Sequence, residues 1–156
     1  MRALLLLPAL LSTAAVAAEP LQPFVSGSLQ KIVAAQRGKP FVLAFWSLDC
    51  SHCQGELQMF GKQLAKQSHV PLVLVSVDAP EQQADIGARL RKYGLESQQA
   101  WVFADMNSDR LRFEIDRRWY GELPRTYLYR ADGSFEAVSG KLEVQRLKTW
   151  LRQNKG

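Results

Sequence analysis

The sequence has little cysteine and little histidine, with two residues of each type among 156. Two cysteines cannot build the framework of several disulfides that stabilises many small exported domains. Zinc sites use about four ligands, and Cys50, Cys53, His52 and His69 match none of the usual spacings. Covalent haem attachment needs Cys-x-x-Cys-His, but Gln54 follows the second cysteine. We therefore expect no metal and no cofactor beyond the cysteine pair itself.

Dense runs of basic residues are absent as well, although the formal net charge is +5 and the isoelectric point about 9.4. The arginines between residues 110 and 118 are interspersed with Asp109, Glu114 and Asp116. Such mixed charge is typical of a solvated surface. We expect no nucleic-acid partner, and a mildly acidic protein partner remains the alternative.

Only one long apolar run is present, and it lies at the start of the chain. Arg2 precedes the apolar residues 3–11, and Ala15-Val16-Ala17 forms an Ala-x-Ala cleavage signature. The sequence predicts a signal peptide over residues 1–17, with cleavage after Ala17 or Ala18. The alternative is an uncleaved anchor, but this run is shorter than a span of about 20 residues, and Pro8 interrupts it. No cysteine follows it to carry a lipid, so we expect a soluble periplasmic protein.

The two cysteines form the motif Cys50-Ser51-His52-Cys53, directly after the apolar residues 40–46 and before a helical pattern over 54–68. Amide groups and the dipole at the start of a helix favour a thiolate, the reactive form of cysteine. A disulfide that closes so short a loop constrains the unfolded chain only weakly. The pattern therefore predicts redox chemistry rather than a structural disulfide.

The rest of the chain predicts one domain over residues 28–156, preceded by a lead-in segment over 18–27. Helices are expected at 28–36, 54–68, 80–93, 108–119 and 142–153, and strands at 39–46, 71–77, 100–104, 127–130 and 135–138. Asp132-Gly133 predicts a hairpin between the last two strands. A parallel core followed by an antiparallel hairpin indicates an α/β domain in which helices flank a central mixed sheet.

Phe45-Trp46, the cysteine motif and Leu123-Pro124 before the strand Tyr127-Leu128-Tyr129 together resemble the thioredoxin fold. The signal peptide, the extra helix and strand before Pro124 and the Asp-Gly hairpin resemble exported thiol-disulfide oxidoreductases of the TlpA/ResA type. The resemblance covers residues 41–151. It implies a thioredoxin-like three-layer fold with thiol-disulfide chemistry at the cysteine pair.

The resemblance also implies roles for single residues. Cys50 matches the exposed nucleophile and Cys53 the buried resolving thiol. Pro124 matches a cis-proline that, with Leu123 before it, lies against the dithiol. Glu56 matches an acidic residue near the active site, and Trp46 is expected in the core and in the groove wall.

Three departures from the family pattern bear on the site, and a histidine between the cysteines bears on the direction of exchange. Asp49 replaces the usual Trp and opposes thiolate formation. Ala44 replaces a buried Asp, which leaves Glu56 as the candidate for proton transfer. Arg125 replaces the usual Thr, and its charge is expected to favour a thiolate or to select an acidic substrate. His52 between the cysteines raises the potential if it is cationic.

The sequence thus predicts thiol-disulfide exchange with protein substrates, in the reducing direction rather than the oxidising one. Cytochrome c apoproteins, other exported dithiol proteins and a membrane electron donor are partners that the resemblance implies. Oxidation of exported dithiols is one alternative. A Cu(I)-binding metallochaperone is another, with His69 or Met59 as third ligand beside the two thiolates.

Overall fold

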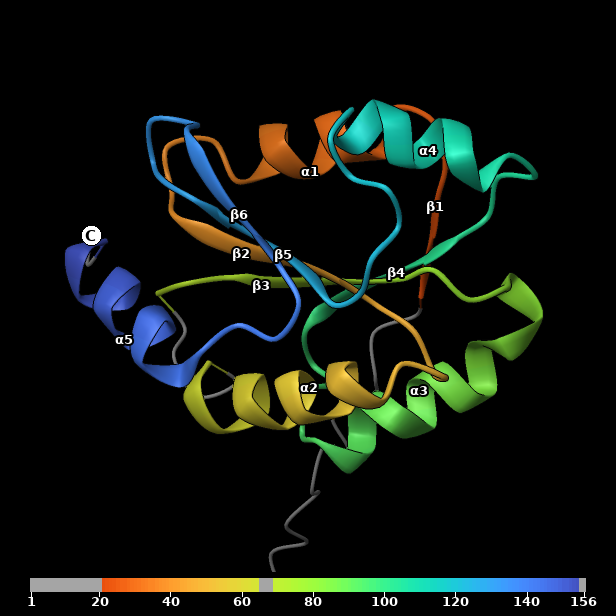
Figure 1. Cartoon of the computed structure of the whole chain (residues 1–156), viewed down its shortest axis with the longest axis horizontal. Coiled ribbons are helices and arrows are strands. Elements are labelled where there is room, and N and C mark those ends of the chain that lie inside the picture. Colours follow the sequence, from red (N-terminus) through yellow and green to blue (C-terminus); the bar gives the residue numbers. More distant parts are fainter. Residues whose placement is uncertain (1–20, 65–68, 155–156) are drawn as a thin grey trace, which may run out of the picture.

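The computed structural model describes residues 21–64 and 69–154, which form a six-stranded sheet between two layers of helices (Figure 1). The elements are β1 (Gln22–Phe24), α1 (Ser28–Ala35), β2 (Phe41–Trp46), α2 (Ser51–Gln63), β3 (Leu72–Ser76), the short 3₁₀ helix η1 (Pro80–Gln82), α3 (Gln83–Lys92), β4 (Gln99–Phe103), α4 (Ser108–Ile115), β5 (Arg125–Tyr129), β6 (Phe135–Ser139) and α5 (Val144–Gln153).

The strands lie in the order β1-β4-β3-β2-β5-β6. The first four are parallel to their neighbours, whereas β5 is antiparallel to β2, and β6 to β5. All six residues of β2 are buried, as expected for a strand covered on both faces. The predicted mixed sheet is therefore confirmed, and β2 lies near its centre.

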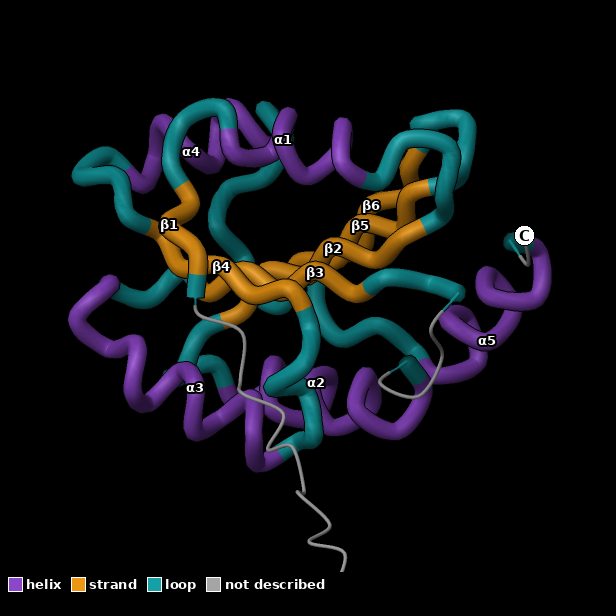
Figure 2. The backbone as a smooth tube through the Cα atoms, turned by 180° about the vertical axis from the view of Figure 1, so that it is seen from behind, coloured by secondary structure: helices purple, strands orange, loops and turns teal. Residues whose placement is uncertain are grey.

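Helices α1 and α4 cover one face of the sheet, and α2, α3 and α5 cover the other (Figure 2). Because side chains alternate along a strand, β2 contributes to two separate cores. Val42, Ala44 and Trp46 pack beneath α2, α3 and α5, whereas Phe41 and Phe45 pack beneath α1 and α4. The predicted three-layer arrangement is thus confirmed.

The lead-in segment predicted over 18–27 contributes a strand to the sheet, which the sequence analysis missed. Gln22, Pro23 and Phe24 pair with Trp101, Val102 and Phe103 of β4, and Phe24 is buried. A three-residue strand containing proline gives almost no sequence signal, and proline is tolerated because β1 lies at the sheet edge. The folded domain therefore begins before residue 28.

Among the helix limits that differ from the sequence prediction, two bear on the cysteine pair and on Pro124. Helix α2 begins at Ser51 rather than Gln54, so the second cysteine lies inside it. Helix α4 ends at Ile115 rather than Trp119. Asp116 has an extended backbone there, and the indole of Trp119 donates a hydrogen bond to the carbonyl of Glu122. These contacts form a loop that leads to Pro124.

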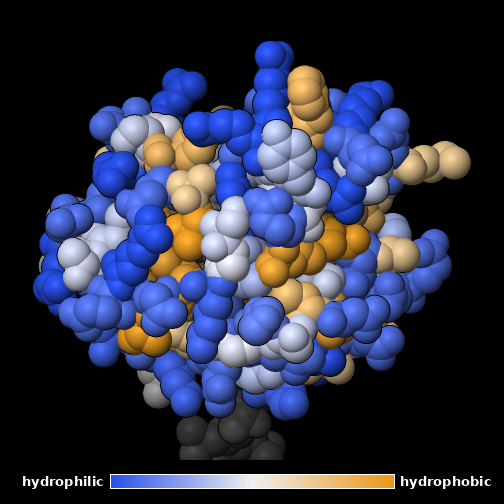
Figure 3. All heavy atoms as spheres, viewed as in Figure 1, coloured by the Kyte–Doolittle hydropathy of each residue, from blue (hydrophilic) through white to orange (hydrophobic). Residues whose placement is uncertain are grey.

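The surface in Figure 3 is mostly hydrophilic, with patches of apolar residues between the charged ones. Among the residues that the structure describes, the large apolar side chains that are exposed are Met106, Phe113, Tyr120, Phe135 and Val144. No helix in residues 21–64 and 69–154 is long and apolar enough to cross a membrane. The predicted signal peptide, residues 1–17, lies outside the described residues.

Candidate active site

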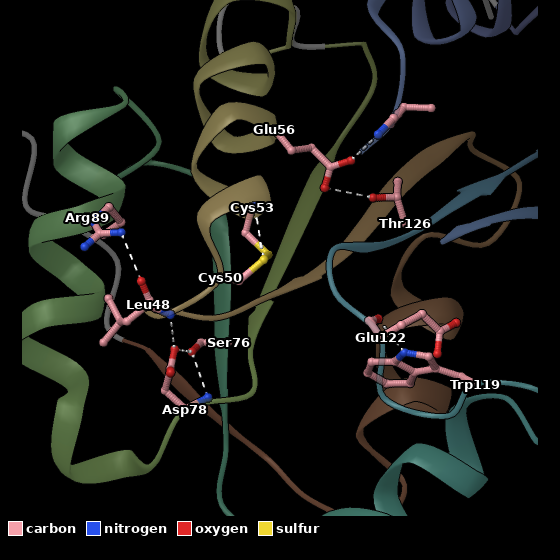
Figure 4. The surroundings of a disulfide bond; sticks show 11 residues. Leu48, Cys50, Cys53, Glu56, Ser76, Asp78, Arg89, Trp119, Glu122 and Thr126 are labelled. Atoms are coloured by element: carbon pink, nitrogen blue, oxygen red, sulfur yellow. Dashed lines mark hydrogen bonds between the residues drawn. A yellow bond between two sulfur atoms is a disulfide. The ribbon is translucent and has the colours of Figure 1, made fainter. Parts of the chain in front are cut away.

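The two cysteines form a disulfide where β2 leads into α2, with an S–S distance of 2.06 Å (Figure 4). Strand β2 ends at Trp46, and a short loop leads to Cys50, which is the N-cap of α2. Cys53 lies in the first turn of the helix. The buried strand and the helix together thus fix the position of the pair predicted from the sequence.

The two sulfur atoms have different surroundings. Cys53 is fully buried, whereas Cys50 is half-buried and packs at the margin of the core. The Cys53 amide donates a hydrogen bond to Cys50 Sγ at 3.1 Å. In the reduced protein the same amide and the helix dipole stabilise a thiolate at Cys50. This asymmetry fits Cys50 as the attacking sulfur and Cys53 as the resolving one.

The loop before Cys50 is anchored by residues that the sequence analysis did not single out. Leu48 donates its amide hydrogen to Asp78 Oδ2 at 2.9 Å, and its carbonyl accepts from Arg89 at 3.4 Å. Ser76 donates its hydroxyl hydrogen to the same oxygen of Asp78 at 2.5 Å. Asp78 follows the end of β3, beside the end of β2 (Figure 4). The parallel pairing of the two strands was the signal that could have identified it.

Glu56 lies one helical turn after Cys53 and is only 2 % exposed. Figure 4 shows its side chain directed from α2 toward β5. Its carboxylate accepts hydrogen bonds from the Leu142 amide at 2.8 Å and the Thr126 hydroxyl at 3.3 Å. Burial raises the pKa of Glu56 to about 7, although these hydrogen bonds and the charge of Lys141 partly oppose the shift. Glu56 can therefore gain or lose a proton at neutral pH.

Leu123 and Pro124 are joined by a cis peptide bond, so the cis-proline implied by the resemblance is confirmed. The Pro124 carbonyl accepts a hydrogen bond from the Gly140 amide at 2.9 Å. Leu123 packs against both cores and shares the core on the α2 side with Cys50. The segment before β5 is thus tied to the core that carries the disulfide.

The expected role of Arg125 at the thiolate is wrong. Its guanidinium donates hydrogen bonds to the carboxylate of Asp116 at 2.7 Å and to the hydroxyl of Tyr127 at 3.1 Å. It also donates hydrogen bonds to Glu122 and Ser139. Its neighbour Tyr127 belongs to the core beneath α1 and α4. Because side chains alternate along β5, Thr126 reaches Glu56, whereas Arg125 lies on the opposite face. The charge of Arg125 is therefore paired with the carboxylates of Asp116 and Glu122.

Arg125 instead ties the loop after α4 to the sheet. The side chain of Asp116 is 7 % exposed, and burial alone would raise its pKa. Hydrogen bonds from the Arg118 amide and the Arg125 guanidinium, with the arginine charges, outweigh burial and hold that pKa below its usual value. Asp116 is therefore an ionised partner for Arg125.

The remaining residues near the motif lie partly in the core and partly at the surface. Trp46 is 1 % exposed and packs in the same core as Cys53, which confirms its expected core position. His52 and Asp49 are both exposed on either side of Cys50. No group of three or more His, Cys, Asp and Glu side chains within the described part of the chain is placed to hold a metal ion. Met59, one of the predicted copper ligands, is buried.

A mixed sheet of this order, a cysteine pair at the β2–α2 junction and a cis-proline before β5 define a thioredoxin-fold protein with a disulfide active site. The model of the AhpC/TSA family matches residues 26–134, and the chain belongs to that family. No curated protein matches the sequence.

Solved structures with the same fold agree with this class. A secreted Mycobacterium tuberculosis disulfide oxidoreductase, homologous to E. coli DsbE, is 22% identical with a TM-score of 0.62, and the match covers 77% of this chain and 85% of that one. A thioredoxin-related protein from Neisseria meningitidis is 19% identical with a TM-score of 0.61, over 78% and 89% of the two chains. StoA from Bacillus subtilis is 20% identical with a TM-score of 0.53, over 73% and 83%.

Proposed function

We propose that this protein is a thiol-disulfide oxidoreductase that reduces disulfides in exported proteins. The observation that carries the proposal is the asymmetric Cys50–Cys53 pair at the start of α2. Cys50 is half-buried, and its sulfur accepts a hydrogen bond from a helix amide. Cys53 is buried in the first turn of the same helix. That arrangement suits a nucleophile and a resolving thiol.

The reaction has two exchange steps. The Cys50 thiolate attacks one sulfur of a substrate disulfide, which breaks the substrate S–S bond and forms a mixed disulfide. The leaving thiolate takes a proton from water. Cys53 then loses its proton and attacks Cys50 Sγ, which releases the second substrate thiolate. Two electrons pass to the substrate, and Cys50–Cys53 returns to the disulfide seen in the structure.

The buried carboxylate supports the second step. Cys53 is reactive only as a thiolate, and a buried thiol resists ionisation. Glu56, one turn away on the same helix, has a pKa of about 7. We propose that its protonation state is coupled to that of Cys53, so that a protonated Glu56 favours the Cys53 thiolate.

We further propose that residues 1–17 direct export and that the protein acts in the periplasm. The M. tuberculosis structure with the same fold is described as secreted, which supports this location. Each cycle leaves the pair oxidised, so a donor of two electrons must regenerate it. A membrane thiol-disulfide protein that reduces Cys50–Cys53 is the partner we propose for that step.

Turbidity from insulin reduction by dithiothreitol tests the activity. The wild type should accelerate it, whereas Cys50→Ser and Cys53→Ser should not. Ser51→Ala, an exposed change within the same motif, is the matched control and should keep the rate. Only Cys53→Ser should accumulate a mixed disulfide that dithiothreitol releases. Equal rates for Cys50→Ser and the wild type would contradict the assignment.

The reduction potential of the pair tests the direction. A value below about −250 mV supports reduction, whereas one near −120 mV identifies an oxidant. It is measured by equilibration with glutathione buffers, with the dithiol fraction read after alkylation. Trapping substrates on Cys53→Ala in periplasmic extract then identifies the physiological partners.

A further inference from the structure

A cavity of about 390 Å³ lies between the end of α1 and the turn that joins β5 to β6. Leu29 and Val33 of α1 line it, together with Phe41 and Tyr129, whose rings stack with centroids 4.4 Å apart. Phe41 begins β2, whereas the disulfide follows the other end of that strand. The end of α1 and the β5–β6 turn are seen side by side in Figures 1 and 2. The cavity therefore lies at the opposite end of the sheet from the active site.

Tyr129 gives this cavity a polar group that the fold leaves unused. The residue is 6 % exposed, and its hydroxyl has no hydrogen bond to any side chain or backbone group in the described part of the chain. Burial raises the pKa of Tyr129 to about 12, so the hydroxyl keeps its proton at neutral pH. The hydroxyl is therefore free to donate a hydrogen bond to a ligand in the cavity.

The rim of the cavity carries a surplus of positive charge. Arg37 and Lys39 line it, are exposed and form no salt bridge with any described residue. Arg130 also lines it and contacts Glu136 only at 3.8 Å. Asp132 is the sole acidic residue in the lining, and its carboxylate accepts two hydrogen bonds from Ser134. The local charge favours an anion.

We propose that this cavity binds a small amphipathic anion, an alkyl or aryl group that carries one carboxylate. The apolar part lies against Leu29, Val33 and Phe41. The carboxylate of the ligand pairs with the charges of Arg37 and Lys39 at the rim of the cavity. The hydroxyl of Tyr129 is a neutral donor in the lining, beside the side-chain amides of Gln30 and Gln36. An apolar cavity of this size with a few polar groups is the usual form of a small-molecule site. The proposal does not depend on the proposed function.

The test is a titration of the ¹⁵N-labelled, disulfide-bonded domain with sodium octanoate, monitored by NMR. Gly38 and Gly133 line the cavity, and their amide signals should shift in a saturable way. Gly55 and Gly61 lie in α2, on the opposite face of the sheet from α1, and their signals should not move. Octan-1-ol, of the same chain length without charge, is the matched ligand and should bind at least tenfold more weakly.

Variants separate charge recognition from apolar binding. The double variant Arg37→Glu, Lys39→Glu reverses two exposed rim charges and should weaken octanoate binding at least tenfold while leaving octan-1-ol binding unchanged. Tyr129→Phe should weaken octanoate alone by a few-fold. Insulin reduction should be unaffected by the double variant. Equal affinity for acid and alcohol, shifts confined to Gly55 and Gly61, or an octanoate Kd weaker than about 1 mM would overturn the proposal.

Discussion

Glu56 makes the stability of the fold depend on pH in an unusual direction. Its pKa is raised from 4.5 to about 7 by burial, so the folded protein holds this proton more tightly than the unfolded chain does. Stability then falls as pH rises across this interval, because the native state binds more protons there. The contribution is fully present below about pH 4.5 and is lost as pH rises through about 7. A difference of about 2.5 pH units corresponds to about 3 kcal/mol.

Replacing Glu56 by Gln should remove this dependence. Glutamine keeps an oxygen for the Leu142 amide and has no proton to lose. Urea denaturation of the oxidised protein at pH 5 and pH 8 measures the effect as the difference between variant and wild type, in which all other titrations cancel. The variant should gain about 2.5 kcal/mol on the wild type between these two pH values, because part of the full difference is already lost at pH 5.

The matched control is Glu143→Gln, which changes an exposed acid at the N-cap of α5. Its stability should differ from that of the wild type by no more than about 0.5 kcal/mol, as is usual for a surface substitution. A pH-independent difference for Glu56→Gln as well would refute the raised pKa and with it the proposed coupling of Glu56 to Cys53.

Three further substitutions test the framework of the site, each by urea denaturation unless stated. Gly61→Ala should destabilise the protein because the new Cβ would overlap the backbone oxygen of Tyr93. Gly55→Ala on the same helix meets only ordinary contacts and should stabilise the protein by about 0.5–1 kcal/mol. Arg125→Met should cost about 3 kcal/mol, because it removes the shortest ion pair of the Asp116 carboxylate, and a cost below about 1 kcal/mol would contradict that pairing. Asp78→Ala should make the Leu48 amide exchange about tenfold faster, a loss of about 1.4 kcal/mol, and an unchanged rate would show that this hydrogen bond does not hold the loop.

Local signals predicted most of the fold. The apolar runs at 39–46 and 71–77 and the Asp132-Gly133 turn produce strands and a hairpin within a few residues of the expected limits. Strand β1 was missed because three residues that include Pro23 have no recognisable pattern, and they become a strand only when β4 pairs with them. Their pairing depends on residues almost eighty positions away in the chain.

The active site could be predicted only in part for the same reason. The cysteine pair lies within four residues of sequence, and the cis bond before Pro124 follows from the resemblance. Arg125 and Thr126 are adjacent in sequence, but the register of β5 places them on opposite faces of the sheet. Asp78 reaches the loop before Cys50 only because β2 and β3 are parallel neighbours.

The structure also changes which charge we expect to affect the reduction potential most. From the sequence, His52 and Asp49 oppose each other beside the nucleophile. Both are exposed, and exposed charges contribute at most about 1 kcal/mol. Since about 1.4 kcal/mol corresponds to 30 mV, neither residue accounts for the roughly 150 mV between strong oxidants and thioredoxin-like reductants. Glu56 is buried close to the resolving cysteine, where water screens its charge far less. Its protonation state is therefore expected to move the potential more than His52 and Asp49 together, so Glu56→Gln should shift the potential measured at pH 8 more than His52→Gln or Asp49→Asn does.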